Sequence, residues 1–321
     1  MALDLTITEL NGQLVDTVKA SLGKTGQKQL PYSWFYDEIG SALFEVITLL
    51  PEYGLTRAEA RLLRRYAHTI VNRLTGSISV AELGSGTGTK TRWILEAQRS
   101  RGSLRYYPID ISSSALDRCE RDMQALMGIP VDKLNKSYLD GLEQVVAVRP
   151  ADEALLVLFL GSSIGNLQPA EADTLLGDIR RLLKKGDALL LGTDLQKGTA
   201  RMLAAYDDAL GVTAAFNLNL LGHLNRALGT DFDLAGFAHE ARYNQQEHRI
   251  EMHLRSLRDQ TVTIPDGDFR VHLRQNETIW TESSYKYRPE QVHEMAQRLG
   301  FNPGGQWIDE EWSFAANLWL V

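Results

Sequence analysis

Residues 80–91 read Val-Ala-Glu-Leu-Gly-Ser-Gly-Thr-Gly-Thr-Lys-Thr, an apolar strand with a glycine-rich turn directly after it. A second predicted strand ends on Asp110, in the run Tyr-Tyr-Pro-Ile-Asp. Glycines let the backbone of such a turn adopt positive φ and approach a ligand more closely than a side chain would allow. An acid at the tip of the next strand can accept hydrogen bonds from both hydroxyls of a ribose. The stretch therefore predicts a strand-helix-strand unit that binds a nucleoside-like cofactor.

The spacing of the glycines in this turn narrows the choice of cofactor. They are Gly84, Gly86 and Gly88. A dinucleotide fold uses Gly-x-Gly-x-x-Gly, and here the third glycine comes one residue early. A phosphate loop requires Gly-x-x-x-x-Gly-Lys-Ser/Thr, and Thr89 stands where its second glycine belongs. Glu82 and Asp110 would repel phosphates and tolerate a sulfonium cation, which favours S-adenosylmethionine. A phosphate loop, a dinucleotide fold and a turn without a ligand are the alternatives.

Composition predicts a globular protein and excludes several classes of partner. The chain has 321 residues, of which 44% are hydrophobic and 23% charged, enough to bury a sizeable core. A formal net charge of −7 argues against a nucleic-acid partner. The single cysteine, Cys119, excludes an internal disulfide and lies in a predicted amphipathic helix, where packing is its expected role. No apolar run has the length of a membrane span and no secretory signal is visible, so we expect a cytoplasmic protein.

From about residue 56 to 195 helical and strand patterns alternate, as a parallel sheet with helices on both faces requires. Near-continuous apolar strands are typical of burial on both faces. The expected helices cover 57–74, 90–100, 113–127 and 169–184, and the expected strands cover 78–83, 104–109, 154–160 and 187–193. A helix at 289–299 and a strand at 314–321 resemble the end of the same domain. We therefore expect an α/β domain, Rossmann-like, formed by residues 56–195 and 287–321.

Residues 1–55 and 196–286 do not continue this alternation. The longer stretch predicts helices at 198–210 and 214–228 and strands at 249–255 and 277–285. Together the two stretches predict a second, α+β domain over the mouth of the cofactor site.

Several short sequence motifs outside the glycine turn narrow the choice of function further. They are Trp34-Phe35-Tyr36-Asp37, Leu50-Pro51-Glu52-Tyr53, Phe159-Leu160-Gly161-Ser162-Ser163-Ile164-Gly165-Asn166-Leu167, Gly192-Thr193-Asp194-Leu195, Ala205-Tyr206-Asp207-Asp208, Gly211-Val212-Thr213-Ala214-Ala215-Phe216-Asn217 and Thr281-Glu282-Ser283-Ser284. In this order they resemble the L-histidine Nα-methyltransferase family of ergothioneine biosynthesis, over almost the whole chain.

The resemblance implies a Rossmann-like methyltransferase domain with a separate substrate-binding domain. It also implies three methyl transfers from S-adenosylmethionine to L-histidine, through the mono- and dimethyl forms, giving the betaine hercynine without a metal. A monomer is expected. An Nα-methyltransferase for another amino acid such as tryptophan, a catalytically silent S-adenosylmethionine-binding protein and a phosphate-loop nucleotidase are the alternatives.

The same resemblance implies which residues hold the cofactor. Gly84 and Lys90 would contact its methionine part and Asp110 its ribose hydroxyls. The family has an Asp-Phe pair beside the adenine, and this chain has Ser137 and Tyr138 there. Tyr138 can stack on the adenine, whereas the hydrogen bond to the exocyclic amine would fall to Asp140 if it is kept.

The resemblance further implies a catalytic place for Tyr36, Phe44 and Gly161, the first two lining the space around the amine. Asn166 and Tyr206 would hold the α-carboxylate of the substrate. The imidazole would be contacted by Tyr53, Glu282, Ser284 and Met252.

The pattern alone favours plainer roles for these residues. It indicates a core position for Met252, a helix cap for Asn166 and a solvent-exposed strand face for Glu282 and Ser284. His248 and His253 are five residues apart on a predicted strand and face opposite sides, so no metal site is expected.

Overall fold

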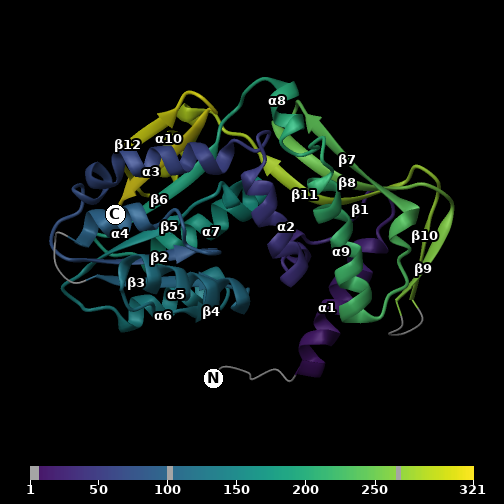
Figure 1. The fold of residues 1–321 in the computed structure, drawn as a ribbon, viewed down its shortest axis with the longest axis horizontal. Coiled ribbons are helices and arrows are strands. Elements are labelled where there is room, and N and C mark those ends of the chain that lie inside the picture. The colour runs from purple at the N-terminus through teal and green to yellow at the C-terminus, as the bar shows by residue number, and fades with distance from the viewer. Residues whose placement is uncertain (1–6, 100–103, 265–268) are drawn as a thin grey trace. The chain divides into compact units, whose positions relative to one another are not determined.

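The computed structural model describes residues 7–99, 104–264 and 269–321 (Figure 1). It divides into two compact units, each formed by two stretches of chain. Unit 1 comprises Met1–Tyr53 and Gly198–Ser284, and unit 2 comprises Gly54–Lys197 and Tyr285–Val321. Ser100, the expected end of one helix, lies outside the described residues.

In its described residues unit 2 contains a seven-stranded sheet in the order β12-β13-β6-β5-β2-β3-β4. The strands from β6 to β4 are parallel, and β13 is antiparallel to both of its neighbours. Their bounds are β2 Ile78–Leu83, β3 Arg105–Asp110, β4 Leu134–Asn135, β5 Ala154–Phe159, β6 Ala188–Asp194, β12 Asn302–Asp309 and β13 Phe314–Leu320. The strand order reverses between β2 and β5, the point at which a doubly wound sheet binds its ligand. The predicted Rossmann-like α/β fold is confirmed.

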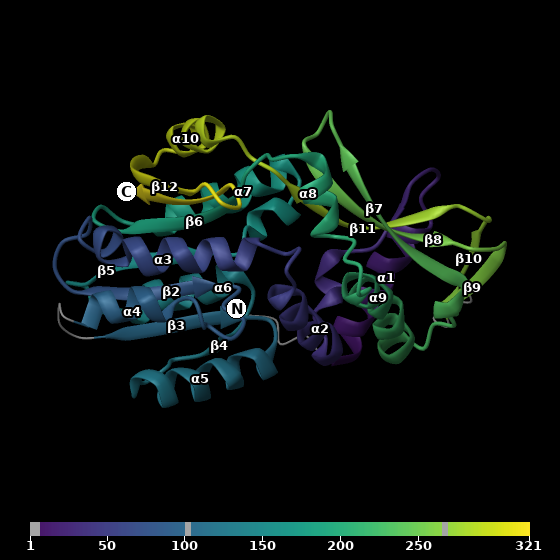
Figure 2. The same cartoon turned by 45° about the horizontal axis from the view of Figure 1, so that its top comes forward.

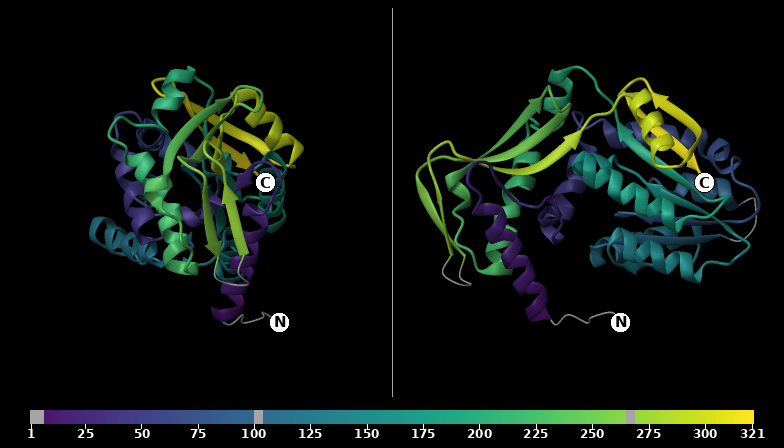
Figure 3. Two further views of the ribbon diagram at one scale, coloured as in Figure 1. Left: turned by 90° about the vertical axis from the view of Figure 1, so that its right-hand side faces the viewer. Right: turned by 180° about the vertical axis from the view of Figure 1, so that it is seen from behind.

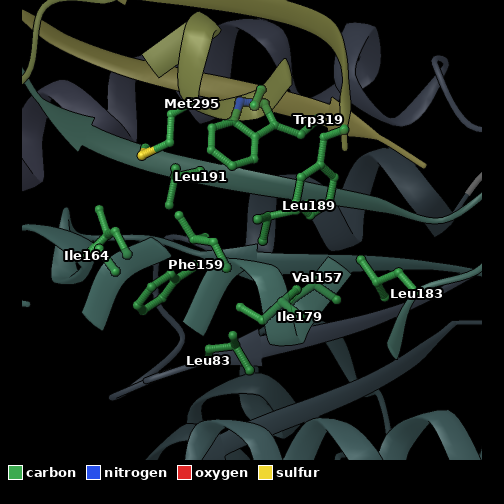
Figure 4. Packing of buried hydrophobic residues seen from close by; sticks show 14 of the residues in the cluster. Leu83, Val157, Phe159, Ile164, Ile179, Leu183, Leu189, Leu191, Met295 and Trp319 are labelled. Carbon is green, nitrogen blue, oxygen red and sulfur yellow. The ribbon is translucent and has the colours of Figure 1, made fainter. Parts of the chain in front are cut away.

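Helices cover both faces of this sheet, as Figures 1 and 3 show from its two sides. One face carries α3 (Leu55–Val71), α4 (Arg92–Arg99) and α5 (Ser113–Met127), and the other carries α6 (Tyr138–Val148), α7 (Pro169–Leu182) and α10 (Pro289–Arg298). On the second face the helices and strands share one buried cluster (Figure 4) that includes Phe159, Ile179, Leu191 and Trp319. Burial of these side chains is the main favourable contribution to the stability of unit 2.

Local sequence explains why these elements begin and end where they do. All six residues of β2 are buried, which a parallel strand covered on both faces requires. The Ser112 hydroxyl caps α5 by accepting from the Ala115 N–H, and Gly128 ends that helix in the left-handed conformation, with φ of 64°. Ser137 caps α6 in the same way, accepting from the Asp140 N–H.

Unit 1 pairs a four-stranded sheet, in the order β1-β11-β8-β7, with a two-stranded sheet of β10 and β9 in its described residues (Figure 2). The strands are β1 Lys28–Gln29, β7 Phe237–Asn244, β8 Arg249–Ser256, β9 Gln260–Ile264, β10 Phe269–Leu273 and β11 Thr278–Tyr285. The helices are α1 Ile7–Leu22, α2 Glu38–Leu49, α8 Thr199–Ala204 and α9 Val212–Leu228, with short 3-10 segments at Tyr32–Phe35 and Leu234–Gly236. Helix α9 packs on α2 and on strands β7 and β8. The unit is α+β.

Several elements differ from the sequence predictions. Helix α6 was not predicted at all. The helix expected at 198–210 ends at Ala204, and the Asp208 carboxylate accepts instead from the Val212 and Thr213 N–H groups at the start of α9. His248 does not lie on a strand but in the turn between β7 and β8, with φ of 52°.

In the described part of the chain no helix combines the length and apolar character that a membrane span requires.

Candidate functional site

The glycine turn lies at the carboxyl end of β2, beside the point where the strand order reverses. Gly84, Gly86 and Gly88 all have positive φ, of 67°, 52° and 66°. The Gly84 N–H donates to the Ile109 carbonyl at 2.8 Å, which ties the turn to the end of β3. A β-carbon at Gly88 would lie 2.7 Å from the Cys119 sulfur, so this glycine is required for packing as well as for its backbone angle. The turn is thus a fixed backbone surface rather than a loose loop.

Asp110, the last residue of β3, faces this turn. One of its carboxylate oxygens accepts from the Gly86 N–H at 2.9 Å and the other from the Ser112 N–H at 2.9 Å. Burial raises the pKa of Asp110, and the hydrogen bonds from Ser112 and Gly86 act against that rise. The Ile111 N–H acts in the same direction, so backbone donors on this stretch hold the carboxylate. The carboxylate is therefore oriented at the turn by backbone hydrogen bonds.

Tyr138 lies on the other side of the turn, at the start of α6. A β-carbon built on Gly84 would lie 3.2 Å from the Tyr138 hydroxyl, so the phenol borders the glycine backbone. The Tyr138 ring also meets Phe159 edge-on, with centroids 5.3 Å apart. Ser137 accepts from the Asp140 N–H and donates to the Asp140 carboxylate at 2.6 Å. Ser137 and Asp140 thus bond to each other at the helix N-terminus.

Lys90 and Gly161 meet at a buried carboxylate that the sequence interpretation did not single out. Glu59, on α3, has no exposed surface and pairs with the Lys90 ammonium. Its other oxygen accepts from the Gly161 N–H at 2.8 Å. Gly161 has φ of 73° and follows β5. The signal for Glu59 in the sequence was an acid within the apolar stripe of an amphipathic helix, between Ala58 and Leu62.

Glu82 does not take the role proposed from the sequence. Its carboxylate is buried and accepts from the Thr91 hydroxyl at 2.7 Å and from the Tyr106 hydroxyl. Burial raises its pKa to about 7, while the bonds from Tyr106 and Thr91 act in the opposite direction. Glu82 therefore ties β2 to β3 and to the start of α4. Glu82 is therefore not a negative charge that would repel a phosphate ligand. The electrostatic argument against a phosphate-bearing cofactor rests on Asp110 alone.

Unit 1 gathers five aromatic side chains into one cluster, here called the aromatic cluster. Its members are Tyr36, Phe44, Tyr53, Tyr206 and Phe216. Phe44 meets Tyr36, Tyr53 and Phe216 with ring centroids 5.9, 6.3 and 6.0 Å apart. Tyr53 also meets Tyr206, at 6.2 Å. The structure thus brings together, from sequence positions far apart, four residues that the resemblance assigned to the site and Phe216, which lies in one of the motifs that carry the resemblance.

The Tyr206 hydroxyl and the Ser284 hydroxyl lie 2.7 Å apart, which joins the aromatic cluster to β11. His239 fixes the backbone at the same place, since its Nε2 lies 2.7 Å from the Tyr206 carbonyl, which can only accept. Nε2 therefore carries the proton, and Nδ1 accepts from the Asn217 amide at 2.8 Å. Burial lowers the pKa of His239, in accord with a neutral ring. His239 was missed from the sequence because a histidine in a half-buried strand carries no signal of its own.

The remaining candidate residues lie on β8, β11 and η2 (Ser163–Asn166). Met252 is buried on β8, and its carbonyl accepts from the Thr281 hydroxyl at 3.0 Å. Glu282 is partly exposed on β11, whereas Ser284 is buried, so the expected exposed face is found only in part. Asn166 belongs to unit 2, where it ends η2. The five other substrate candidates all belong to unit 1.

Comparison with known proteins identifies the family of this chain. Residues 14–321 match the model of the histidine-specific, S-adenosylmethionine-dependent methyltransferases. The chain belongs to this family. It is 42% identical to the histidine N-alpha-methyltransferase of Mycolicibacterium smegmatis, over 91% of this chain and 90% of that one, and 41% identical to that of Mycobacterium tuberculosis, over 94% and 92%. The Ergothioneine biosynthesis protein 1 of Neurospora crassa is 31% identical over 88% of this chain and 32% of its own length.

Among the described residues, no cluster of metal-binding side chains lies at the glycine turn or at the aromatic cluster. Within the described ranges, no group of three or more histidine, cysteine, aspartate or glutamate side chains is arranged to hold a metal ion. Cys119 is buried, and burial raises its pKa to about 12, so the thiol is a packing group.

Proposed function

We propose that this protein transfers three methyl groups from S-adenosylmethionine to the α-amine of L-histidine. The substrate would pass through its mono- and dimethyl forms and leave as hercynine, the first step of ergothioneine biosynthesis. Membership of the histidine-specific family supports the reaction. The observation that carries the assignment to this chain is the aromatic cluster joined by Tyr206 to Ser284 on β11.

The groups around the glycine turn fit the proposed methyl donor. Asp110 presents two oxygens suited to ribose hydroxyls, and the Tyr138 ring borders Gly84, where it can stack on an adenine. Lys90 supplies a cation for the methionyl carboxylate. When bound, S-adenosylmethionine supplies an electrophilic methyl group on a sulfonium whose leaving thioether is neutral. The protein therefore needs no acid to assist the leaving group.

The aromatic cluster suits an amine that becomes progressively methylated. Each transfer needs a free lone pair, so the α-ammonium must lose one proton before every step. Rings around the amine remove water, and desolvation lowers the pKa of an ammonium group. Tyr36 offers a hydroxyl that can pass the proton to solvent. The faces of Tyr36, Phe44 and Phe216 can stabilise the final quaternary cation by cation–π attraction, worth roughly 0.5–2 kcal/mol for each contact.

The polar candidates suit the two ends of a histidine. Tyr206 and Asn166 are neutral donors for its carboxylate. Glu282, Ser284 and Tyr53 would contact the imidazole, with Met252 against the ring. A carboxylate at that end favours a ring with an N–H donor over an apolar ring, because a buried polar group left unpaired costs binding free energy.

The direct test is methylation of a panel of amino acids, followed by mass spectrometry. Purified protein, S-adenosylmethionine and each amino acid in turn are incubated, and products are separated by mass. We expect histidine to gain one, two and then three methyl groups, with the trimethyl product accumulating. A mass gain on tryptophan but not on histidine would mean that tryptophan is the substrate. S-adenosylmethionine binding without any product would indicate a silent binding protein.

Glu282→Ala tests the substrate end separately. We expect the dissociation constant for histidine, measured by calorimetry, to rise about tenfold or more, because the imidazole loses a charged acceptor. The dissociation constant for S-adenosylhomocysteine should change less than twofold. Glu247→Ala is the matched control, since Glu247 is exposed in the turn between β7 and β8 of the same unit. Equal weakening of both ligands by Glu282→Ala would mean that this residue supports the fold instead.

A further inference from the structure

Glu59 is a buried acid on the apolar face of α3. Its neighbours on that face are Leu55, Ala58, Leu62 and Leu63, and all five residues are buried. A carboxylate in such surroundings costs several kcal/mol unless it is paired and hydrogen-bonded. The Glu59 carboxylate therefore needs partners whose interactions offset this cost.

Both oxygens of Glu59 have a partner from a different loop. Oε1 accepts from the Gly161 N–H at 2.8 Å, and Oε2 accepts from the Lys90 ammonium. A β-carbon on Gly192 of β6 would lie only 2.4 Å from Oε1, so a glycine in the strand leaves the space that the carboxylate occupies. The carboxylate thus links α3 to the loop after β5 and to the turn after β2.

Two other buried acids of unit 2 provide a contrast. Glu153 accepts from Ser79 and pairs with Arg105, and Asp187 pairs with Arg149. Glu153 and Asp187 directly precede β5 and β6, so they lie at the amino ends of the parallel strands. Lys90 and Gly161 follow the carboxyl ends of β2 and β5, the edge at which such a sheet binds ligands. The partners of Glu59 are therefore at the ligand-binding edge, whereas those of Glu153 and Asp187 are not.

We propose that Glu59 is a positioning residue for the cofactor: its carboxylate holds the Lys90 ammonium and the Gly161 backbone where they meet the methionyl end of S-adenosylmethionine. This inference rests on the proposed function. An ammonium has three N–H donors, and Glu59 takes one of them, which leaves two that a ligand carboxylate can accept. The Lys90 side chain is 25% exposed while the Glu59 side chain is fully buried, so the pair presents its cation and hides its anion.

Three variants separate this role from a structural one. Glu59→Gln keeps an oxygen for the Gly161 N–H but places an amide where Oε2 faced Lys90. Lys90→Met removes the cation, and the double variant removes both. Calorimetry with S-adenosylhomocysteine should show about tenfold weaker binding for each single variant. The double variant should bind no more weakly than Lys90→Met, because Glu59 acts through Lys90 and the two effects are not additive. The dissociation constant for histidine should change less than twofold throughout.

Glu153→Gln is the matched control, because it also neutralises a buried acid of the same sheet and should leave cofactor affinity unchanged. If Glu59→Gln does not fold, Gly192→Ala serves instead: its methyl group displaces the Glu59 carboxylate without changing any charge, and it should weaken the same binding. Unchanged affinity in the folded variant, or additive losses in the double variant, would overturn the inference. Failure of the unaltered protein to bind S-adenosylhomocysteine would instead overturn the proposed function.

Discussion

At the scale of single residues, Glu82 shows how burial changes the meaning of an acid. The side chain ends β2 next to the glycine turn, yet its carboxylate points at Thr91 and Tyr106. Desolvation outweighs these two hydrogen bonds and raises the pKa of Glu82 to about 7. The same surroundings raise the pKa of Tyr106 well above its usual value. The group is thus a structural acid that titrates near neutral pH.

This raised pKa predicts a specific dependence of stability on pH. Because the folded pKa exceeds the usual value of 4.5, the protonated form of Glu82 favours folding, and its contribution is lost as the pH rises through 7. The loss is about 3 kcal/mol at most, from roughly 1.4 kcal/mol for each pKa unit. Glu82→Gln should match the unaltered protein in urea unfolding at pH 5 and exceed its stability at pH 8. Glu96→Gln, at an exposed position of α4, is the control. Parallel stability curves from pH 5 to 8 would contradict the prediction.

Which site residues could be predicted depended on what surrounds each in the sequence. Gly84 and Asp110 stand directly after apolar strands, so strand order alone placed them at one edge of the sheet. Tyr36 and Tyr206 have no such marker and were found only through the family resemblance, since nothing local brings aromatic residues 170 positions apart into one cluster. Glu59 was missed although helical periodicity places it on the apolar face with Leu62 and Leu63, because periodicity does not show what a buried acid is paired with. Only its tertiary partners give it a role.

At the scale of elements, the bounds of helices and strands were predicted accurately where the apolar periodicity is strong. They were predicted wrongly where residues at helix ends were misinterpreted. Strand β2 and helix α5 have the predicted bounds, because each combines an apolar pattern with a clear start and stop. Helix α6 was overlooked although Ser137 and Asp140 have the spacing of a helix N-terminus. The helix after residue 198 was predicted too long because Asp208 fits a helical pattern, whereas its carboxylate bonds to the first N–H groups of α9. The half-exposed strand β7 has too few apolar residues to show alternation.

At the scale of the whole molecule, one buried carboxylate of unit 2 pairs with a lysine beside each place where the chain passes from one unit to the other. Asp194 ends β6 and pairs with Lys197 at 2.6 Å and with Lys286 at 2.9 Å. The two lysines lie within two residues of the crossings at Gly198 and Tyr285. Trp312 donates its indole N–H to the same carboxylate at 3.1 Å. Burial acts to raise the pKa of Asp194, but the ammonium groups of Lys286 and Lys197 outweigh it and lower the pKa.

Asp194→Asn should therefore be strongly destabilising. It removes the carboxylate that pairs with two lysines, whose side chains are 4% and 0% exposed. Removing one partner of a buried pair costs about 3–5 kcal/mol, whereas an exposed pair is worth about 0–1 kcal/mol. Asp173→Asn, which breaks the exposed pair with Arg298, is the matched control for urea unfolding at pH 7.

The effect of Asp194→Asn should also have a defined pH dependence. Because the folded pKa of Asp194 is lowered, its contribution is present above the usual carboxyl pKa of about 4 and is lost as the pH falls through the folded value. The stability gap between the unaltered protein and Asp194→Asn should therefore stay constant from pH 6 to 8 and narrow only in acid. A gap no larger than that of Asp173→Asn would show that the two crossings are held by backbone pairing, such as that between Gln196 and Tyr287, and not by this charge.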